Sequence, residues 1–223
     1  MKCAVLGRGK SLGLWNAIPA KPIFKFIYLV NNCSEEVRRI GLSVEDYDHL
    51  DHVCGRKGAT ILDKDVYEDL CVGWVRVNAL GYQKIENVKR MLQRFPIELM
   101  ASSRPNCMLD RGYPPIGWKK LLKGVTEAAP KSDNGNCWPT TGLYAIDLML
   151  TAYRPSELWL FGFDFYSQSY MIKPNRSYQT QKNPKVKMMY VYLQKLVDEF
   201  KDTQFYSASD LGMKGDNWHL ISK

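Results

Sequence analysis

Apolar runs of strand length alternate along this chain with segments whose apolar residues recur at helical spacing. The run CAVLG (residues 3–7) ends at a glycine, and FKFIYLVNN (residues 24–32) is rich in aromatic and branched side chains, both typical of strands. Four later segments, LCVGWVRVNA, IELMAS, ELWLFGFDF and TQFYSAS, are further predicted strands (residues 70–79, 97–102, 157–165 and 203–209). Helical spacing predicts helices over residues 85–95, 141–153 and 186–200.

This alternation of strands and helices predicts an α/β fold, with an open, mostly parallel sheet flanked by helices. The 223 residues suffice to bury a full core, and we see no internal repeat or linker. We therefore expect a single domain spanning residues 1–223.

Composition is that of a soluble globular protein, with 45% hydrophobic and 24% charged residues. The apolar run near the N-terminus is interrupted by charge and is too short for a signal-peptide core. No window approaches the roughly 18 apolar residues of a membrane helix. We expect a cytoplasmic protein without a membrane span.

Cysteine spacing and net charge narrow the choice of ligands. The 6 cysteines are scattered, with no CxxC pair and no neighbouring histidines, so we expect reduced thiols and no metal site. The net charge of +8 favours an anionic partner, such as a nucleotide, a nucleic acid, an anionic glycan or a membrane surface. A solvated basic surface is the alternative interpretation.

Chemically distinctive residues follow four of the predicted strands, where ligands collect in parallel sheets. The first strand leads into GRGKS (residues 7–11), the second into Asn31 and Asn32, the third into Asn78, and a late one into DFY (residues 164–166). Each asparagine can contact a base or ribose edge, although asparagine is also a common turn former.

The glycine-flanked turn GRGKSL allows backbone N–H groups to approach an anion, and Ser11 can donate a further hydrogen bond. It matches neither the dinucleotide GxGxxG pattern nor a Walker loop, and a plain strand-to-helix turn is the alternative. In WPTTG, Thr140, Thr141 and Gly142 stand where a helix begins, so they either cap the helix or receive an anionic ligand.

These motifs in combination resemble the bacterial lipooligosaccharide sialyltransferases and, more distantly, the animal sialyltransferases. In the bacterial family a GNGPSL-like turn follows the first strand, and a small-hydroxyl-glycine turn precedes a helix and a strand ending in GIDFY. The matching stretches here are CAVLGRGKSL and PTTGLYAIDLMLTAYRPSELWLFGFDFYSQSY, with LVNN and VRVNA between them.

The resemblance implies a Rossmann-like, GT-A-like domain with a short lid at residues 167–185. It also implies an inverting, metal-independent transfer of sugar from a CMP-sugar to a hydroxyl group, with the nucleotide-sugar as co-substrate and no cofactor. Tyr166 and Tyr170 match the tyrosines that hydrogen-bond the leaving phosphate. The positions that match donor-binding residues are Gly7, Arg8, Gly9, Ser11, Asn31, Asn78, Thr141 and Gly142.

The chain departs from the family at the general base, because Thr180 stands where a lid histidine is expected. His219 is one candidate for that role, with a surface or capping histidine as the alternative. His49 and His52, with the carboxylates beside them, are a second candidate. An acidic acceptor or Asp164 is a third, although Asp164 also suits bracing of a strand end.

Two further departures concern charge. Arg8 replaces the family's asparagine and would add a bidentate phosphate donor. The lid region carries Lys173, Arg176, Lys182 and Lys185, which we expect to contact the acceptor. A glycan or a hydroxymethylated base in DNA fits a basic lid. The competing interpretation is a non-enzymatic nucleotide-binding or interaction protein that has lost the base.

Overall fold

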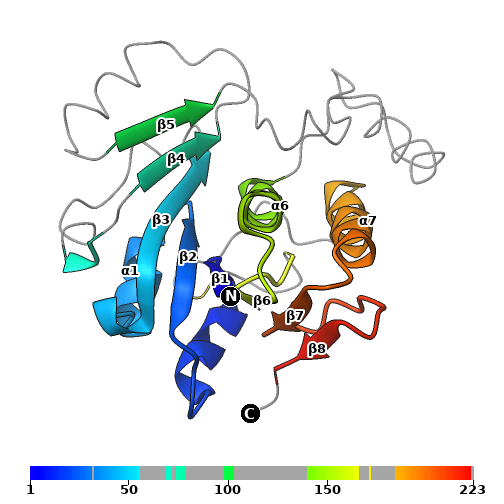
Figure 1. Ribbon diagram of the computed structural model, residues 1–223, viewed down its shortest axis with the longest axis horizontal. Coiled ribbons are helices and arrows are strands. Elements are labelled where there is room, and N and C mark those ends of the chain that lie inside the picture. Colours follow the sequence, from blue (N-terminus) through cyan, green and yellow to red (C-terminus); the bar gives the residue numbers. More distant parts are fainter. Residues whose placement is uncertain are drawn as a thin grey trace.

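The computed structural model describes residues 1–31, 33–55, 69–71, 74–78, 98–102, 140–165, 171 and 184–221, of which 54–55, 74–78, 98–102 and 184–188 are described by their backbone alone. Within this part of the chain lies one parallel sheet of 8 strands in the order β5-β4-β3-β2-β1-β6-β7-β8 (Figure 1). The strands are β1 (Lys2–Leu6), β2 (Phe24–Val30), β3 (Tyr47–Gly55), β4 (Trp74–Asn78), β5 (Glu98–Ser102), β6 (Glu157–Phe161), β7 (Gln204–Ser207) and β8 (Trp218–Leu220).

The strand order contains a reversal beside β1. The chain starts at β1, builds outward through β2 to β5, and then returns to the other side of β1 with β6, β7 and β8. The loops that leave β1 and β6 therefore diverge from neighbouring strand ends. In open parallel sheets this reversal is the place where ligands bind.

Helices cover both faces of the sheet. They are α1 (Ser34–Arg39), α6 (Thr141–Tyr153), α7 (Pro184–Glu199) and the 3-10 helices η1 (Lys10–Ala17) and η2 (Val44–Asp46). Figure 1 shows α6 beside α7, and these two helices share one core with Val5, Tyr28 and Leu160. On the opposite face, η1 and α1 pack against a second core that includes Leu6 and Leu29.

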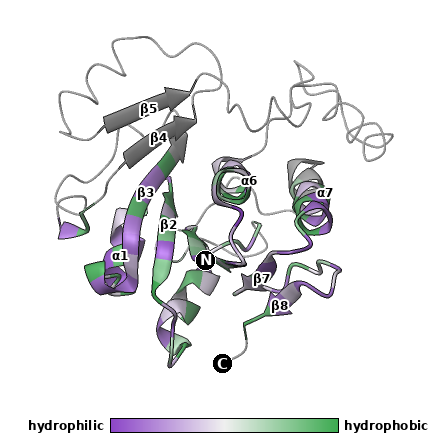
Figure 2. Ribbon diagram, viewed as in Figure 1, coloured by the Kyte–Doolittle hydropathy of each residue, from purple (hydrophilic) through white to green (hydrophobic). Residues whose placement is uncertain are grey.

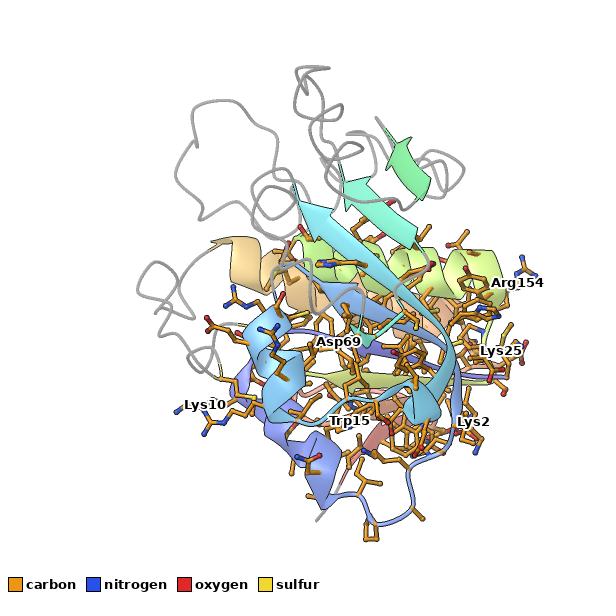
Figure 3. All side chains as sticks on the ribbon, turned by 90° about the vertical axis from the view of Figure 1, so that its left-hand side faces the viewer. Lys2, Lys10, Trp15, Lys25, Asp69 and Arg154 are labelled. Atoms are coloured by element: carbon orange, nitrogen blue, oxygen red, sulfur yellow. The ribbon has the colours of Figure 1, made fainter. Side chains whose placement is uncertain are left out.

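Alternation along the central strands divides these two cores. Val5 is in register with Tyr28 and Leu160, whereas the next residue, Leu6, is in register with Leu29 and points to the other face. Hydrophobic residues run along β2 and part of α6 in Figure 2. In the side view of Figure 3, Trp15 lies among packed side chains, whereas Lys10 and Arg154 lie at the periphery.

The parallel α/β architecture confirms the sequence prediction, as do the strands at β1, β2, β6 and β7 and the helices α6 and α7. Strands β4 and β5 confirm two further predicted strands, although Leu70 and Cys71 are not part of β4. The predicted helix over residues 85–95 lies outside the described residues. The sequence analysis missed β3, β8 and the short helix α1. No helix in the described ranges is long and apolar enough to cross a membrane.

Gly7 and Gly162 bring the ends of β1 and β6 into direct backbone contact. The Gly7 N–H donates to the Phe161 carbonyl oxygen at 2.7 Å. A Cβ atom on Gly7 would lie 2.5 Å from the Gly162 carbonyl oxygen, and one on Gly162 would lie 2.5 Å from the Gly7 oxygen. Gly162 also has a φ of 73°, which side chains rarely adopt. Neither position has room for a side chain.

We expect Gly7→Ala to lower the free energy of unfolding by roughly 2 kcal/mol or more, because the added methyl meets backbone that cannot move aside. Gly13→Ala is the matched control, since Gly13 is exposed in η1 and its nearest outside atom would be 4.0 Å away. We expect that change to stay within about 0.5 kcal/mol. Denaturant unfolding measures both, and equal effects would contradict the packing argument.

Candidate functional site

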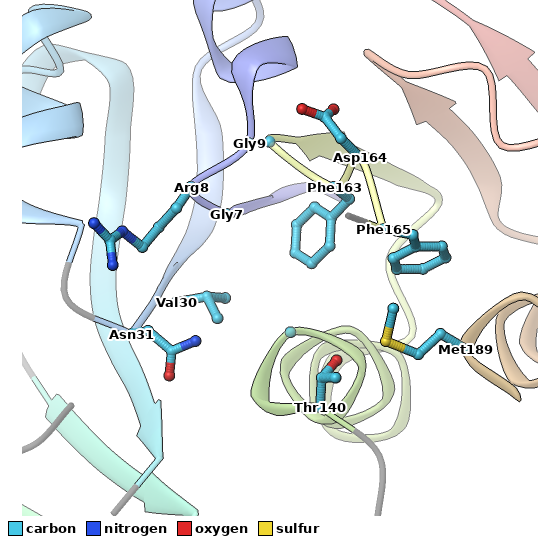
Figure 4. A pocket seen from close by; sticks show the side chains of 12 residues that line it. Gly7, Arg8, Gly9, Val30, Asn31, Thr140, Phe163, Asp164, Phe165 and Met189 are labelled. Atoms are coloured by element: carbon cyan, nitrogen blue, oxygen red, sulfur yellow. The ribbon is translucent and has the colours of Figure 1, made fainter. Parts of the chain in front are cut away.

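A cleft opens at the point where β1 and β6 separate (Figure 4). Its walls come from the loops after β1, β2 and β6, from the start of α6 and from α7. Figure 4 shows Arg8 and Asn31 on one side and Phe163 and Phe165 on the other. The described lining residues are Gly7, Arg8, Gly9, Val30, Asn31, Thr140, Gly142, Gly162, Phe163, Asp164, Phe165 and Met189.

Asn31 forms the turn that carries the chain from β2 toward α1. Its φ of 59° lies in the left-handed region that asparagine tolerates better than most residues. The backbone N–H donates to the Val53 carbonyl at 2.9 Å, and its carbonyl accepts from the Cys33 N–H at 3.1 Å. The turn-forming interpretation is confirmed. Asn31 also lines the cleft, and its contact with a base or ribose edge stays a prediction.

Asp164 braces the loop after β6 and is only 3% exposed. One carboxylate oxygen accepts from the Ser11 N–H at 3.2 Å, and the other accepts from the Ser209 hydroxyl. The Ser11 hydroxyl in turn accepts from the Gly162 N–H at 3.0 Å. Ser11, predicted to contact a donor, thus binds the loop after β6 and is not among the lining residues.

The glycines predicted to make room for a ligand are also required by packing. A Cβ on Gly9 would meet the Asp164 carboxylate, and a Cβ on Gly142 would lie 2.7 Å from the Phe163 ring. The Gly9 N–H donates to the Gly162 carbonyl at 2.9 Å. The residues after β6 therefore already occupy the space that these glycines leave.

Helix α6 directs its N-terminus at the cleft. Thr140 is the capping residue, since its backbone is extended and its hydroxyl accepts from the Leu143 N–H at 3.5 Å. The first turn contains no acidic residue, so the positive end of the helix dipole is not offset there. The lining residues are Thr140 and Gly142, and the predicted Thr141 is not among them.

A buried carboxylate holds α6 against α7. Asp147 is 0% exposed and accepts hydrogen bonds from the Tyr192 hydroxyl at 2.7 Å and the Thr151 hydroxyl at 3.2 Å. These bonds satisfy a buried polar group that would be costly to leave without hydrogen-bond partners. The sequence analysis missed this link, which fixes the position of the α6 N-terminus relative to Met189 of α7.

Arg8 lines the cleft but is paired with a residue that the sequence analysis did not single out. The Oε1 atom of Glu36 in α1 accepts a hydrogen bond from Nε of Arg8 at 2.8 Å and forms an ion pair with Nη2, also at 2.8 Å. The Glu36 side chain is 1% exposed and that of Arg8 is 20% exposed. The predicted phosphate donor is thus oriented by a buried carboxylate.

None of the chain's 3 histidines is among the described residues that line the cleft. His219 lies on the edge strand β8, where its Nε2 is 2.6 Å from Gln204 Oε1 and its ring contacts Tyr206. His49 stacks on Phe26, and His52 is buried. Because β3 is a strand, residues three apart such as His49 and His52 point to opposite faces.

Burial lowers the pKa of His52 from 6.5 to about 3, and a hydrogen bond with the Asn31 backbone offsets only part of this effect. The imidazole is therefore neutral in the folded chain near neutral pH. The side chain is also 1% exposed and is not among the described residues that line the cleft. These facts argue against His52 as a general base.

Tyr190 of α7 is a phenol near the cleft that the sequence analysis missed. Its ring meets Phe165 edge to face, with centroids 5.1 Å apart. Burial raises its pKa, and the negative charges of Asp164 and Asp210 raise it further. The hydroxyl therefore keeps its proton and can donate a hydrogen bond. Only its helical spacing in α7 was visible in the sequence.

Several predicted residues lie outside the described residues: Asn32, Tyr166, Tyr170, Lys173, Arg176, Thr180 and Lys182. Asn78 ends β4 and Lys185 belongs to the first turn of α7, both described by backbone alone. Within the predicted lid, the N–H of Met171 donates to the Arg8 carbonyl at 2.8 Å. The chain after Tyr170 thus returns to the turn after β1.

Metal ligands do not gather in the part of the chain that the structure describes, where no group of three or more histidine, cysteine, aspartate or glutamate side chains could hold an ion. The expectation of a metal-free site stays a prediction.

Two solved sialyltransferase structures are similar to this chain. One is CstII from Campylobacter jejuni in complex with the substrate analogue CMP-3FNeuAc, 15% identical, with 93% of this chain and 80% of that chain covered and a TM-score of 0.38. The other is CST-II in complex with a trisaccharide acceptor and CMP, 13% identical, with 100% and 96% covered and a TM-score of 0.38. A similarity this low adds no weight to fold or function. No protein-family model and no curated protein matches the sequence.

Because His52 is buried as a neutral imidazole, we expect the free energy of unfolding to fall at low pH. Between pH 6.5 and about 3 the unfolded chain binds a proton at this residue and the folded chain does not, so stability falls as the pH drops. We expect His52→Gln to reduce the slope of unfolding free energy against pH by up to about 1.4 kcal/mol per unit. Denaturant unfolding at several pH values measures this slope.

The control is His49→Gln, which removes an exposed histidine from the same strand and should leave the slope unchanged. A His52→Gln variant with the wild-type slope would mean that the folded chain accommodates the charged imidazole.

Proposed function

We propose that the chain is a glycosyltransferase that binds a nucleotide-activated sugar in this cleft and transfers the sugar to a hydroxyl acceptor. The observation that carries the proposal is the position of the α6 N-terminus opposite the Gly7–Gly9 turn at the reversal of strand order. The N–H groups at the start of α6 suit a phosphate group. The Gly7–Gly9 turn borders the opposite side of the cleft, and its Gly7 and Gly9 N–H groups already donate to Phe161 and Gly162. Asn31, on the adjacent strand end, suits a base or ribose edge.

The proposed reaction is an inverting displacement at the anomeric carbon of a CMP-sugar, without a metal ion. The bond from the sugar to the phosphate oxygen breaks as the acceptor hydroxyl attacks, and charge develops on the departing phosphate. The helix amides of α6 would stabilise that charge. Tyr166 and Tyr170 are the proposed phenol donors, and Tyr190 is a further phenol beside the cleft.

The acceptor hydroxyl must also lose a proton. His52 is buried, His219 is on β8, and Asp164 already accepts from Ser11 and Ser209. The positions of these side chains favour an acidic acceptor that takes the proton itself over the His219 alternative. An anionic glycan with a carboxylate group suits that role. A hydroxymethylated base in DNA is the alternative acceptor, but its phosphate diesters are too weakly basic to take the proton, so that transfer requires a separate base.

Calorimetry with CMP, UMP and GMP, and with CMP-, UDP- and GDP-sugars, tests donor binding. We expect saturable binding of at least one nucleotide and slow hydrolysis of its sugar. Tyr166→Phe and Tyr170→Phe should lower turnover by roughly 10²-fold or more with little loss of affinity, because the phenols act on the developing charge. Binding without any turnover would favour the nucleotide-binding protein, and no binding would refute the donor site.

Acceptor class is tested by charge reversal in the predicted lid. If DNA is the acceptor, Lys182→Glu and Lys185→Glu should each weaken DNA binding and reduce its dependence on salt, because each removes a phosphate contact. Lys201→Glu is the matched control, since Lys201 is exposed just beyond the opposite end of α7. Equal losses in all three variants, measured by fluorescence anisotropy at several salt concentrations, would indicate nonspecific attraction and favour the glycan.

A further inference from the structure

An ion pair between Arg8 and Glu36 borders the cleft beside Asn31. A single carboxylate oxygen, Glu36 Oε1, accepts a hydrogen bond from Nε of Arg8 at 2.8 Å and lies 2.8 Å from Nη2 in the ion pair. Two donors converging on one oxygen fix both the position and the rotation of the planar guanidinium. A ligand in the cleft therefore encounters an Arg8 side chain that is already bound to Glu36.

The carboxylate of this pair is buried, whereas Arg8 reaches the cleft. The Glu36 side chain is 1% exposed. Cys33, at the start of α1, is buried beside it, and the pKa of its thiol rises to about 12 through burial and then through the negative charge of Glu36. Removing Arg8 from Glu36 would leave a buried carboxylate unpaired, which is strongly unfavourable. A phosphate therefore cannot simply take the place of Glu36.

The ion pair also affects the net charge of the groups in and beside the cleft. Among its described lining residues, the charged side chains are Arg8 and Asp164, which have opposite signs. Glu36 adds a second negative charge directly behind Arg8. These three groups together carry a net charge of −1, which offsets part of the attraction that the α6 N-terminus exerts on the phosphate charge of a ligand.

We propose that Glu36 is a specificity residue: by cancelling the charge of Arg8 while holding it in place, it limits how much phosphate charge the cleft accepts. This inference rests on the proposed nucleotide-binding function and assigns a role to a residue outside the cleft lining. Glu36 acts on the ligand through Arg8, so it is a positioning residue rather than a catalytic one.

The test compares the dissociation constants of CMP and CDP, measured by calorimetry. If the wild-type chain binds uridine or guanosine nucleotides instead, UMP and UDP or GMP and GDP are compared. Glu36→Gln keeps the shape and an oxygen acceptor for Arg8 but removes the negative charge. We expect the affinity ratio to shift toward the diphosphate by about tenfold, the effect of one charge at close range in a poorly solvated site.

The matched control is Glu35→Gln, which removes the same charge from the preceding, exposed residue of α1. Solvent and salt screen the charge of Glu35. The affinity ratio of this variant should therefore differ from the wild-type ratio by less than about twofold. Arg8→Gln should shift the ratio in the opposite direction. The double variant Arg8→Gln with Glu36→Gln restores the net charge of the pair, so its ratio should return toward the wild-type value even if a single variant folds poorly.

The ratio of the two dissociation constants separates a charge effect from a general loosening of the site. Loosening would weaken the binding of the monophosphate and the diphosphate alike. An unchanged ratio in Glu36→Gln would overturn the specificity role while leaving nucleotide binding intact. Failure of the wild-type chain to bind any monophosphate or diphosphate would overturn both this inference and the proposed function.

Discussion

The contact between the backbones of Gly7 and Gly162 is the constraint on which the cleft depends. Two parallel strands that end side by side send their chains toward opposite faces of the sheet, and here the loops remain close enough for the Gly9 N–H to bond the Gly162 carbonyl. Asp164 and Ser11 then tie the loop after β6 to the start of η1. The opening between these loops and α6 follows from that arrangement.

The central part of the fold was predictable because the hydrophobic pattern within each segment is enough to indicate its secondary structure. The strands β1, β2 and β6 are apolar runs, and α6 has helical spacing with Thr140 as a cap. Strand β3 was not predictable in the same way, since Asp51 and His52 are polar yet buried. Only their neighbours in the folded sheet make a strand of that segment.

The site was predictable to the extent that it lies at strand ends. Parallel strands place their carboxyl ends together, so Arg8 and Asn31 could be expected to meet without knowing any contact. Glu36 and Asp147 could not be anticipated, because their partners are 28 and 45 residues away in sequence. The sequence also could not show that Gly9 and Gly142 are required by the packing of the Asp164 and Phe163 side chains.

The Asp147–Tyr192 hydrogen bond has a mechanical consequence. It joins the middle of α6 to α7 in a buried layer, and α7 also carries Met189 and Tyr190 beside the cleft. Displacement of α7 along its axis would therefore move α6 as well. The direction of the helix dipole at the α6 N-terminus would change with it.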